Sequence, residues 1–529
     1  MSFFVERAQQ IWNSRKLRVA RHIGARLSRC AAYAGLFASV LSVAMAEVPS
    51  VIPSSMPRIG AVDERFQSYN IEMVEVTGGR FWKPYRPNAD AELTTPRDGL
   101  DAPGLKDAHL YQYRPPIDLT NARLRMLAAA LGPAYLRVSG TWANTTYFAD
   151  SDKPPSLPPP SFTGILTRRQ WRDVVRFSQS VNAQIVTSFG ASNRDAVGVW
   201  TPDQAQRLLA YTRSIGGNIA AAEFINEPDL AGTGSVPVGY GAAAYGRDFR
   251  LFHSQIKSTT PDTMILGPGA VGESAAASDL LAASAGGVDA VSYHYYNTVS
   301  ERCGGTTPPE TALSEDWLSG TDRVLSFFGA LRDRFEPGKP IWLTETADAA
   351  CGGNPWAATF VDTFRYLDQL GRLARSGVQV VIHNTLAASD YGLLDEATLR
   401  PRPKYWGALL WRLLMGTTVL DSGAPVQANL HVYAHCQRAV PGGVSLLVIN
   451  TDIKASHSLK LSTASARYTL DAAKLSDSVA RLNGNTLMMG DRSELPTLAG
   501  TPLAAETVTF EPATITFLAI PGAANSSCR

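Results

Sequence analysis

Eight short apolar segments, separated by helix-like stretches, recur along the first three-quarters of this sequence. Each is rich in β-branched or aromatic residues, as expected for a strand that is buried on both faces. In chain order they occupy residues 68–76, 134–140, 184–190, 221–226, 264–269, 290–296, 341–346 and 379–386. The intervening stretches carry helical patterns, for example residues 202–216 and 321–335. Repeated strand–helix alternation predicts an α/β fold, a (β/α)8 TIM barrel, with an open doubly wound sheet as the alternative.

The pattern changes after residues 406–416, which suit the last helix of the barrel. Short alternating runs separated by turn residues follow, and they predict an antiparallel β-sandwich domain. We therefore expect the barrel to span residues 66–416 and the sandwich residues 417–529, with residues 47–65 lending the sandwich an edge strand. The proline-rich stretch at 152–162 is expected to form a stiff loop over one rim of the barrel.

The first 46 residues have the pattern of a secretory signal peptide. Residues 1–29 hold seven Lys or Arg and one acid, and the apolar run 31–43 is followed by Ala44-Met45-Ala46. This run is shorter than the roughly 20 residues that cross a bilayer, so a membrane anchor is the weaker alternative. We expect a secreted or periplasmic chain with no stable membrane span. Removing a net +6 would change the formal charge from +2 to −4, which argues against a nucleic-acid partner.

Cleavage would leave four cysteines, Cys303, Cys351, Cys436 and Cys528. An even number in an exported chain permits disulfides, whereas the lack of a CxxC pair argues against a cysteine metal site. Cys303 follows the sixth predicted strand and Cys351 the seventh, and these strands are neighbours in a barrel. We therefore predict a Cys303–Cys351 disulfide, with a Cys436–Cys528 bridge as a second. Free buried thiols are the alternative.

Two glutamates follow predicted strands at the end where barrel enzymes carry out their chemistry. Glu227 closes the fourth strand, in the run AAEFINEPDL, and Glu345 closes the seventh. The C-terminal ends of barrel strands meet at one mouth, so both carboxylates should face the same cleft. Glycoside hydrolysis needs two such groups, one protonated to donate to the leaving oxygen and one ionised to attack carbon. Solvated strand-end caps are the alternative.

Polar and aromatic residues accompany the two glutamates. Asn226 can point its amide at a sugar hydroxyl beside the reacting bond. His294, Tyr295 and Tyr296, at the tip of the sixth strand, can keep the attacking carboxylate ionised and aimed. The only histidines at strand ends are His294 and His383, and they complete no ligand triad, so neither a metal nor another cofactor is expected.

Several segments, all in the expected order, resemble clan A glycoside hydrolases and, within that clan, the heparanase and β-glucuronidase family (family 79), most closely its bacterial single-chain members. They are FQSYNIEMVEV, AYLRVSGTWANTTYF, SFGASNRDA, AAEFINEPDLAG, SYHYY, IWLTETADAACGGNPW and DYGLLDEATLRPRPKYW. The resemblance implies a retaining double displacement in which Glu227 is the acid/base and Glu345 the nucleophile. It also implies carboxyl groups about 5–5.5 Å apart.

The resemblance further implies a pocket for the uronate carboxylate. Backbone N–H groups of Gly352 and Gly353 and the phenol of Tyr391 would hold the anion, although the glycines are also consistent with a simple turn. Glu72 and Thr141 match positions that touch the sugar in similar proteins, and Glu72 is equally consistent with a charge paired inside the barrel. The Cys303–Cys351 bridge would hold the glycines in place.

The functional hypothesis is a secreted, monomeric endo-β-glucuronidase that cleaves a glucuronic-acid-containing polysaccharide such as heparan sulfate. An exo-acting β-glucuronidase is the close alternative, because both need the same uronate pocket. A catalytically idle carbohydrate-binding barrel is the alternative of another class, and the intact pair of glutamates argues against it.

Overall fold

The computed structural model describes residues 48–85, 110–232, 236–424, 426, 428–490 and 494–529. The predicted signal peptide (residues 1–46) lies outside the described residues. Residues 49–529 form one compact unit. None of the described helices is both long and apolar enough to cross a membrane.

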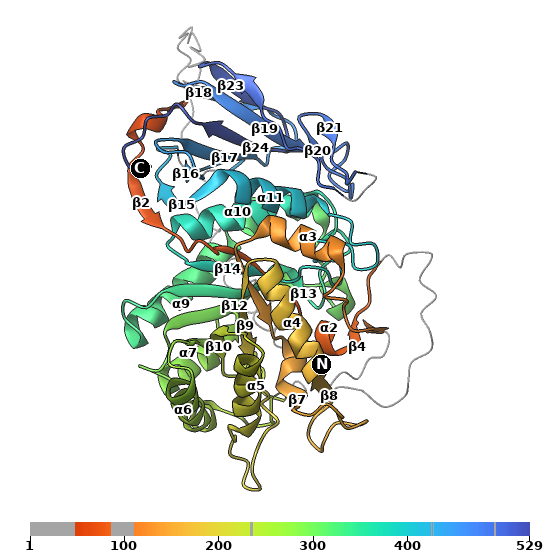
Figure 1. Ribbon diagram of the computed structural model, residues 1–529. Helices are drawn as coiled ribbons and strands as arrows, with labels where there is room; N and C mark the ends of the chain where they lie inside the picture. Colours follow the sequence, from red (N-terminus) through yellow and green to blue (C-terminus); the bar gives the residue numbers. More distant parts are fainter. Residues whose placement is uncertain (1–47, 86–109, 233–235, 425, 427, 491–493) are drawn as a thin grey trace, which may run out of the picture. The chain divides into compact units, whose positions relative to one another are not determined.

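Within the described residues, eight parallel strands close into a barrel, and helices surround it (Figure 1). The strands are β3 (Gln67–Asn70), β6 (Ala134–Val138), β9 (Ala183–Ser188), β10 (Ile219–Glu223), β11 (Met264–Val271), β12 (Ala290–Val299), β13 (Ile341–Ala350) and β14 (Val380–His383). They follow one another around the wall in chain order, and β14 pairs with β3 to close it. The predicted (β/α)8 barrel is confirmed.

The helices of the barrel lie between these strands. They are α2 (Met73–Thr77), α3 (Ala122–Leu131), α4 (Arg168–Ser180), α5 (Asp203–Ser214), α6 (Ala242–Thr259), α7 (Ala275–Ala283), α8 (Glu315–Leu318), α9 (Gly320–Phe335), α10 (Val361–Arg375) and α11 (Pro403–Leu414). Their starts are encoded locally. At α4, for example, Thr167 accepts from the backbone of Gln170, and the Gln170 side chain accepts from the backbone of Thr167. This reciprocal capping satisfies N–H groups that the first turn would otherwise leave unpaired.

The observed strands differ from the predicted ones in extent, and two of them differ most at their C-terminal ends. The predicted strand 68–76 ends at Asn70, and its second half forms α2, because Glu72 and Glu75 cap that short helix reciprocally. Strand β13 continues beyond Glu345 to Ala350, paired with β12 as far as Val299. Glu345 therefore lies within its strand and does not close it.

Two further sheets, largely antiparallel, follow the barrel among the described residues. The larger contains β2 (Arg58–Ala61), β15 (Met415–Leu420), β16 (Leu430–Gln437), β17 (Val444–Asn450), β24 (Thr514–Ile520), β19 (Ser465–Asp471), β20 (Arg481–Leu482), β21 (Asn485–Thr486) and β22 (Thr501–Leu503). The smaller contains β1 (Ser50–Val51), β18 (His457–Leu461) and β23 (Thr507–Phe510). The segment before the barrel thus adds an edge strand to each sheet, β2 to the larger and β1 to the smaller.

The central strands β17 and β24 of the larger sheet are buried on both faces. On one face, Leu446 and Leu518 share an apolar cluster with Phe510 of the smaller sheet. On the other face, Leu447 and Phe517 belong to the main core together with residues of α10 and α11. Strand β17 is consequently buried along its whole length. The smaller sheet and the barrel therefore sandwich the larger sheet through apolar contacts.

Ionisable groups bridge the barrel helices and strand β16. The Asp368 carboxylate on α10 accepts hydrogen bonds from Tyr433 at 2.6 Å and Arg372 at 2.6 Å, and it pairs with His431 Nδ1 at 2.5 Å. His431 Nε2 lies 3.0 Å from Glu315. Burial would lower the pKa of His431, but the Asp368 carboxylate outweighs burial and raises that pKa.

This arrangement predicts a pH-dependent contribution to stability. A raised pKa in the folded state means that the contribution is complete below the ordinary histidine pKa and is lost as pH rises through the folded value. We expect His431→Gln to lower the melting temperature most at about pH 6 and least at about pH 8.5. Calorimetry of the wild-type protein and the variant across this pH range tests the prediction. A difference in melting temperature that does not change with pH would contradict it.

Two small two-stranded sheets are formed by segments that connect barrel strands, one between β3 and β6 and one between β6 and β9. They pair β4 (Gly79–Trp82) with β5 (Tyr111–Arg114), and β7 (Thr146–Ala149) with β8 (Gly164–Thr167). The proline-rich stretch connects β7 to β8, and most of its residues are exposed, as expected of a surface loop.

Candidate active site

A fully buried arginine on β6, Arg137, joins the polar groups at the barrel mouth. Its Nη1 donates to Glu345 Oε2 at 2.8 Å, and its Nε donates to Glu223 Oε2 at 2.9 Å. Its Nη2 donates to Asn226 Oδ1 at 2.8 Å. With its oxygen held by the guanidinium, Asn226 has its amide nitrogen left to bind another group. One side chain thus orients residues of β10, of the loop after it and of β13.

The environment of Glu345 stabilises its ionised form. Besides Arg137, the carboxylate accepts a hydrogen bond from the Tyr296 hydroxyl at 2.5 Å, and His294 Nδ1 lies 3.8 Å from it. Burial would raise the pKa of Glu345, but His294, Arg137 and Tyr296 together outweigh burial and lower it. An ionised, fixed carboxylate is what a nucleophile at carbon requires.

Glu227 lies just beyond the end of β10, on a backbone turn that Asn144 stabilises. Asn144 accepts from the Asn226 N–H at 2.9 Å and donates to the Asn226 carbonyl at 2.8 Å. Glu227 itself has φ of 46°, in the left-handed region that few non-glycine residues adopt. One oxygen of Glu227 and one of Glu345 lie within 4.8 Å of each other. This closeness matches a retaining pair better than an inverting one.

His294 lies between the two carboxylates. Its Nδ1 is 3.0 Å from Glu227 Oε1, and its Nε2 is 3.2 Å from Arg137 Nη2. Burial would lower the pKa of His294, but Glu345 and Glu227 outweigh burial and raise it. Glu227, His294 and Glu345 are close enough to ligate a cation. The guanidinium beside them disfavours one, because it already supplies the positive charge.

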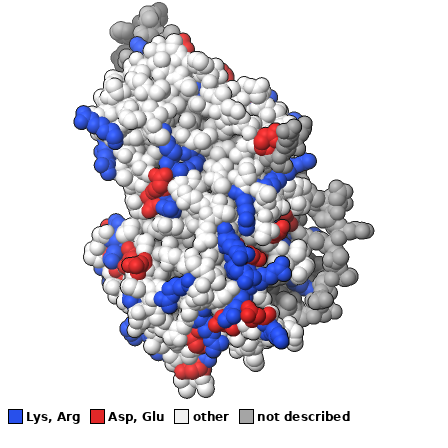
Figure 2. All heavy atoms as spheres, in the orientation of Figure 1, with Lys and Arg blue, Asp and Glu red and all other residues white. Residues whose placement is uncertain are grey.

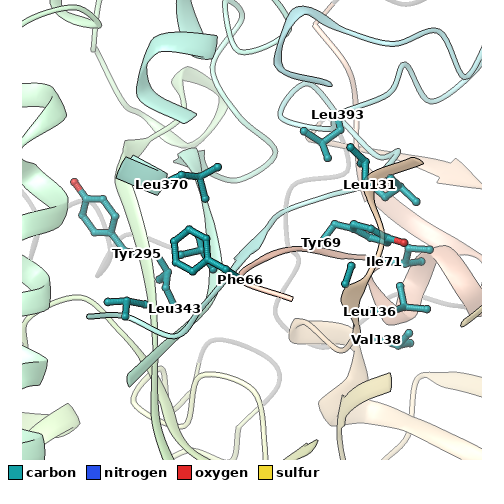
Figure 3. Packing of buried hydrophobic residues seen from close by; sticks show 14 of the residues in the cluster. Phe66, Tyr69, Ile71, Leu131, Leu136, Val138, Tyr295, Leu343, Leu370 and Leu393 are labelled. Atoms are coloured by element: carbon teal, nitrogen blue, oxygen red, sulfur yellow. The ribbon is translucent and has the colours of Figure 1, made fainter. Parts of the chain in front are cut away.

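The three residues predicted at the tip of the sixth strand lie within β12, which continues to Val299. Tyr295 is not part of the site, and that prediction is wrong. Successive strand residues point to opposite faces, so His294 and Tyr296 face the mouth and Tyr295 faces outward. Its hydroxyl lies against Gly320 at the start of α9, and its ring belongs to the main core. Figure 3 shows the phenol pointing away from Phe66 and Leu343.

The predicted anion pocket is present in part. Gly353 N–H donates to the Ala349 carbonyl at 3.2 Å, so that donor is already engaged and its predicted role needs correcting. The buried N–H of Gly352 donates to no group among the described residues. Asn384 Nδ2 lies 3.0 Å from the Tyr296 hydroxyl and 3.3 Å from the Tyr391 hydroxyl, which links Tyr391 to the site. Burial raises the pKa of Tyr391, so its hydroxyl keeps its proton.

Glu72 and Thr141 occupy the rim between β3 and β6. Glu72 is buried, and burial together with the nearby Glu345 charge raises its pKa well above its usual range. Its Oε2 has no hydrogen-bond partner among the described residues and would lie 1.5 Å from a Cβ at position 140, so only Gly140 fits there. Thr141 begins the short 3-10 helix η3 (Thr141–Thr145) directly after Gly140.

Three residues that the sequence analysis missed complete the site: Arg137, Asn144 and Asn384. Arg137 had a usable signal, because an arginine inside the apolar run AYLRV must find acidic partners if the strand is buried. Asn144 had none, since an amide between two elements is usually a turn residue. Asn384 had none, because nothing in the predicted strand 379–386 shows which face it presents.

The described cysteines form two disulfides, Cys303–Cys351 and Cys436–Cys528. The first links the loop after β12 to the loop after β13, immediately before Gly352. The Cys351 carbonyl also accepts a hydrogen bond from Ser300 at 3.1 Å. The bridge therefore restrains the turn that carries the unpaired Gly352 N–H.

A parallel barrel with two close glutamates at its mouth defines this chain as a glycoside hydrolase. The model of the glycosyl hydrolase family 79 N-terminal domain matches residues 117–371. Heparanase-like protein 1 of Arabidopsis thaliana is 30% identical over 373 residues, which are 65% of this chain and 67% of that protein. The chain belongs to glycoside hydrolase family 79.

Two further comparisons agree with this assignment. Heparanase of Mus musculus is 29% identical over 462 residues, which are 75% of this chain and 84% of that protein. Among solved structures, a 4-O-α-L-rhamnosyl-β-D-glucuronidase from Fusarium oxysporum 12S superposes with a TM-score of 0.61. It is 15% identical and covers 89% of this chain and 99% of its own, which supports the fold alone.

Proposed function

We propose that the protein is a retaining endo-β-glucuronidase that cleaves a glucuronic-acid-containing polysaccharide such as heparan sulfate. The observation that carries the mechanism is the approach of Glu227 to Glu345 within 4.8 Å. The substrate class follows from the family and from the relatives named heparanase.

The first chemical step uses both glutamates. Glu345 Oε attacks the anomeric carbon and forms a glycosyl ester, while Glu227 gives its proton to the departing glycosidic oxygen. In the second step Glu227 removes a proton from water, and the resulting attack releases the sugar and frees Glu345. Asn226, with its oxygen held by Arg137, presents its amide to a sugar hydroxyl beside the reacting carbon.

The substrate carboxylate is held by Tyr391 and by the N–H of Gly352. The Tyr391 hydroxyl keeps its proton, and the Gly352 N–H has no internal acceptor among the described residues. Gly352 has φ of 83°, and an added Cβ would lie 2.6 Å from Trp82 Cβ. Only glycine therefore permits this close backbone turn.

Replacing Tyr391 with Phe tests the pocket. We expect kcat/KM for an aryl β-glucuronide to fall roughly 10- to 100-fold, the usual cost of a lost hydrogen bond to a charged group. The matching aryl β-glucoside should change little, because it lacks the carboxylate. Equal losses on the two substrates would show that Tyr391 acts only structurally.

Arginines on the outer face of α4 support an anionic polymer as substrate. Arg169, Arg172 and Arg176 follow one another at intervals of three and four residues, so they share one face of the helix. Figure 2 shows Lys and Arg side chains gathered over α4 and α3 on the face it draws. A strip of positive charge attracts a sulfated or carboxylated chain by long-range electrostatics.

A second candidate, exo-acting cleavage of terminal glucuronic acid, is favoured by a clamp beside the pocket. Arg302 Nη2 donates to Asp390 at 2.6 Å, and its guanidinium lies 4.0 Å from the centre of the Tyr85 ring. This clamp holds the segment that contains Trp82 against Gly352. The carboxylate of a uronate is attached to C5, next to C4, and a 1,4-linked chain would continue from C4. Residues that close the site beside the carboxylate pocket would block that continuation and favour a terminal sugar.

Size analysis of digested heparan sulfate, run beside an aryl glucuronide assay, distinguishes the candidates. Endo action should shorten the average chain early in the digestion, at a small extent of bond cleavage. Exo action should release monosaccharide while the average chain length scarcely changes. A protein that degrades neither substrate would contradict the proposed function altogether.

A further inference from the structure

A buried group of charged side chains lies directly behind the proposed anion pocket. It comprises Asp348 on β13, Asp362 and Arg365 on α10, and Lys404 on α11, each at most 2% exposed. Charged groups are costly to bury unless they are paired and hydrogen-bonded. None of the four takes part in the chemistry described above, so their contacts with the pocket need another explanation.

Lys404 fixes the backbone of Tyr391. Its ammonium donates to Asp362 Oδ2 at 2.7 Å and to the Tyr391 carbonyl oxygen at 3.0 Å. The same carbonyl lies 2.8 Å from Nε2 of His383. Burial and the Lys404 charge lower the pKa of His383 well below its usual range, so the ring is neutral and donates through Nε2. Two buried donors therefore hold one carbonyl.

Asp348 fixes the other half of the pocket. Its Oδ2 accepts the Asn354 N–H at 2.9 Å, which anchors the turn immediately after Gly352 and Gly353. Its other oxygen has no hydrogen-bond partner among the described residues. Burial and the neighbouring Asp362 charge raise the pKa of Asp348 to about 7, against the opposing effect of Lys404.

Asp362 lies near both anchors. It accepts from Arg365 Nε at 2.6 Å as well as from Lys404, and its charge acts on Asp348. The ion pairs of Asp362 with Lys404 and Arg365 thus lie behind Tyr391, and Asp348 lies behind the glycine turn. These two segments come after different strands of the barrel and also contact each other directly, because Asp390 N–H and Ser389 Oγ donate to the Gly352 carbonyl at 3.1 and 2.9 Å.

We propose that Lys404 and Asp348 are positioning residues that make the site selective for uronates; this rests on the proposed function of Tyr391 and Gly352. A phenol and a backbone N–H are directional donors, and their attraction for a carboxylate falls steeply when distance or angle is wrong. Lys404 and Asp348 anchor the backbone that carries these two donors. A neutral sugar does not use these donors and is insensitive to their spacing.

The test compares kcat/KM for an aryl β-glucuronide with kcat/KM for the matching β-glucoside. In Lys404→Met, which keeps the length of the side chain but removes its donor and charge, we expect the glucuronide-to-glucoside ratio to fall at least about tenfold. Lys404→Arg keeps both the donor and the charge and should restore much of the ratio. Asp348→Ala is a smaller disturbance and should also lower the glucuronide-to-glucoside ratio. It tests the positioning role if Lys404→Met does not fold.

Arg372→Met is the matched control, because Arg372 is also a buried, ion-paired cation of the α10 region but contacts Asp368 and not the pocket. It should lower the melting temperature and leave the ratio unchanged. Variants at Lys404 and Asp348 that slow both substrates equally would overturn the inference. A wild-type protein with no preference for the glucuronide would instead overturn the proposed function on which the inference rests.

Discussion

Replacing Glu345 with Ala should abolish turnover of every glycoside, by at least about a thousandfold, because the variant lacks the group that attacks carbon. Glu345→Gln should lose as much activity, although its shape is the same and it still accepts from Tyr296. A 2-deoxy-2-fluoro glucuronide inactivator should label Glu345 in the wild-type protein, and peptide mass mapping should find the label there.

The stereochemistry of chemical rescue provides the sharpest check. With Glu345→Ala, azide should attack an activated glucuronide directly and give the α-glycosyl azide, because only one displacement occurs. Arg137 keeps its bond to Glu223 in this variant, so the fold should survive, as circular dichroism can verify. Labelling of Glu227, or a β-azide from Glu345→Ala, would reverse the two roles.

Replacing Glu227 with Ala should separate substrates by the quality of their leaving groups. General acid assistance contributes about 10²- to 10⁴-fold, so polysaccharide cleavage should lose that much. An aryl glucuronide with an acidic phenol needs little protonation, and its first step should remain fast. The glycosyl ester should then accumulate, because water has lost its base, and a burst of released phenol should be visible.

Azide should accelerate the second step of Glu227→Ala and give the β-glycosyl azide, the anomer opposite to that expected from Glu345→Ala. His294 pairs with Glu227, and its raised pKa depends on both carboxylates. Removing the Glu227 charge should therefore lower the pKa of His294. Equal losses on good and poor leaving groups, without azide rescue, would contradict the acid/base role.

Much of the fold could be predicted because its signals are local. The apolar runs and the intervening helical patterns predict alternating elements, and their number predicts closure into a barrel. The change to short alternating runs after α11 predicts the C-terminal antiparallel strands in the same way. The exception is residues 73–77, where an apolar run suits a strand or a short helix, and the reciprocal capping of Glu72 and Glu75 decides for the helix.

The position of the two glutamates was also predictable. Glu227 and Glu345 follow apolar runs, and parallel strands in a barrel present their C-terminal ends at one mouth. Their approach in the structure follows from topology and needs no knowledge of side-chain packing. Cys303 and Cys351 are close for the same reason, since their loops follow adjacent strands.

Tertiary structure alone decided how each side chain is used. His294 and Tyr295 of β12 are both buried although they point to opposite faces, so the sequence carries no sign of whether His294 and Tyr296 or Tyr295 faces the mouth. The partners of Arg137 come from β10, β12 and β13 or the loop after β10. The Gly353 N–H is engaged because the turn after β13 brings it back to the Ala349 carbonyl. The sequence by itself determined a barrel with two carboxylates at one mouth. Their charge, orientation and surroundings depend on contacts between residues far apart in the chain, which form only when the barrel closes.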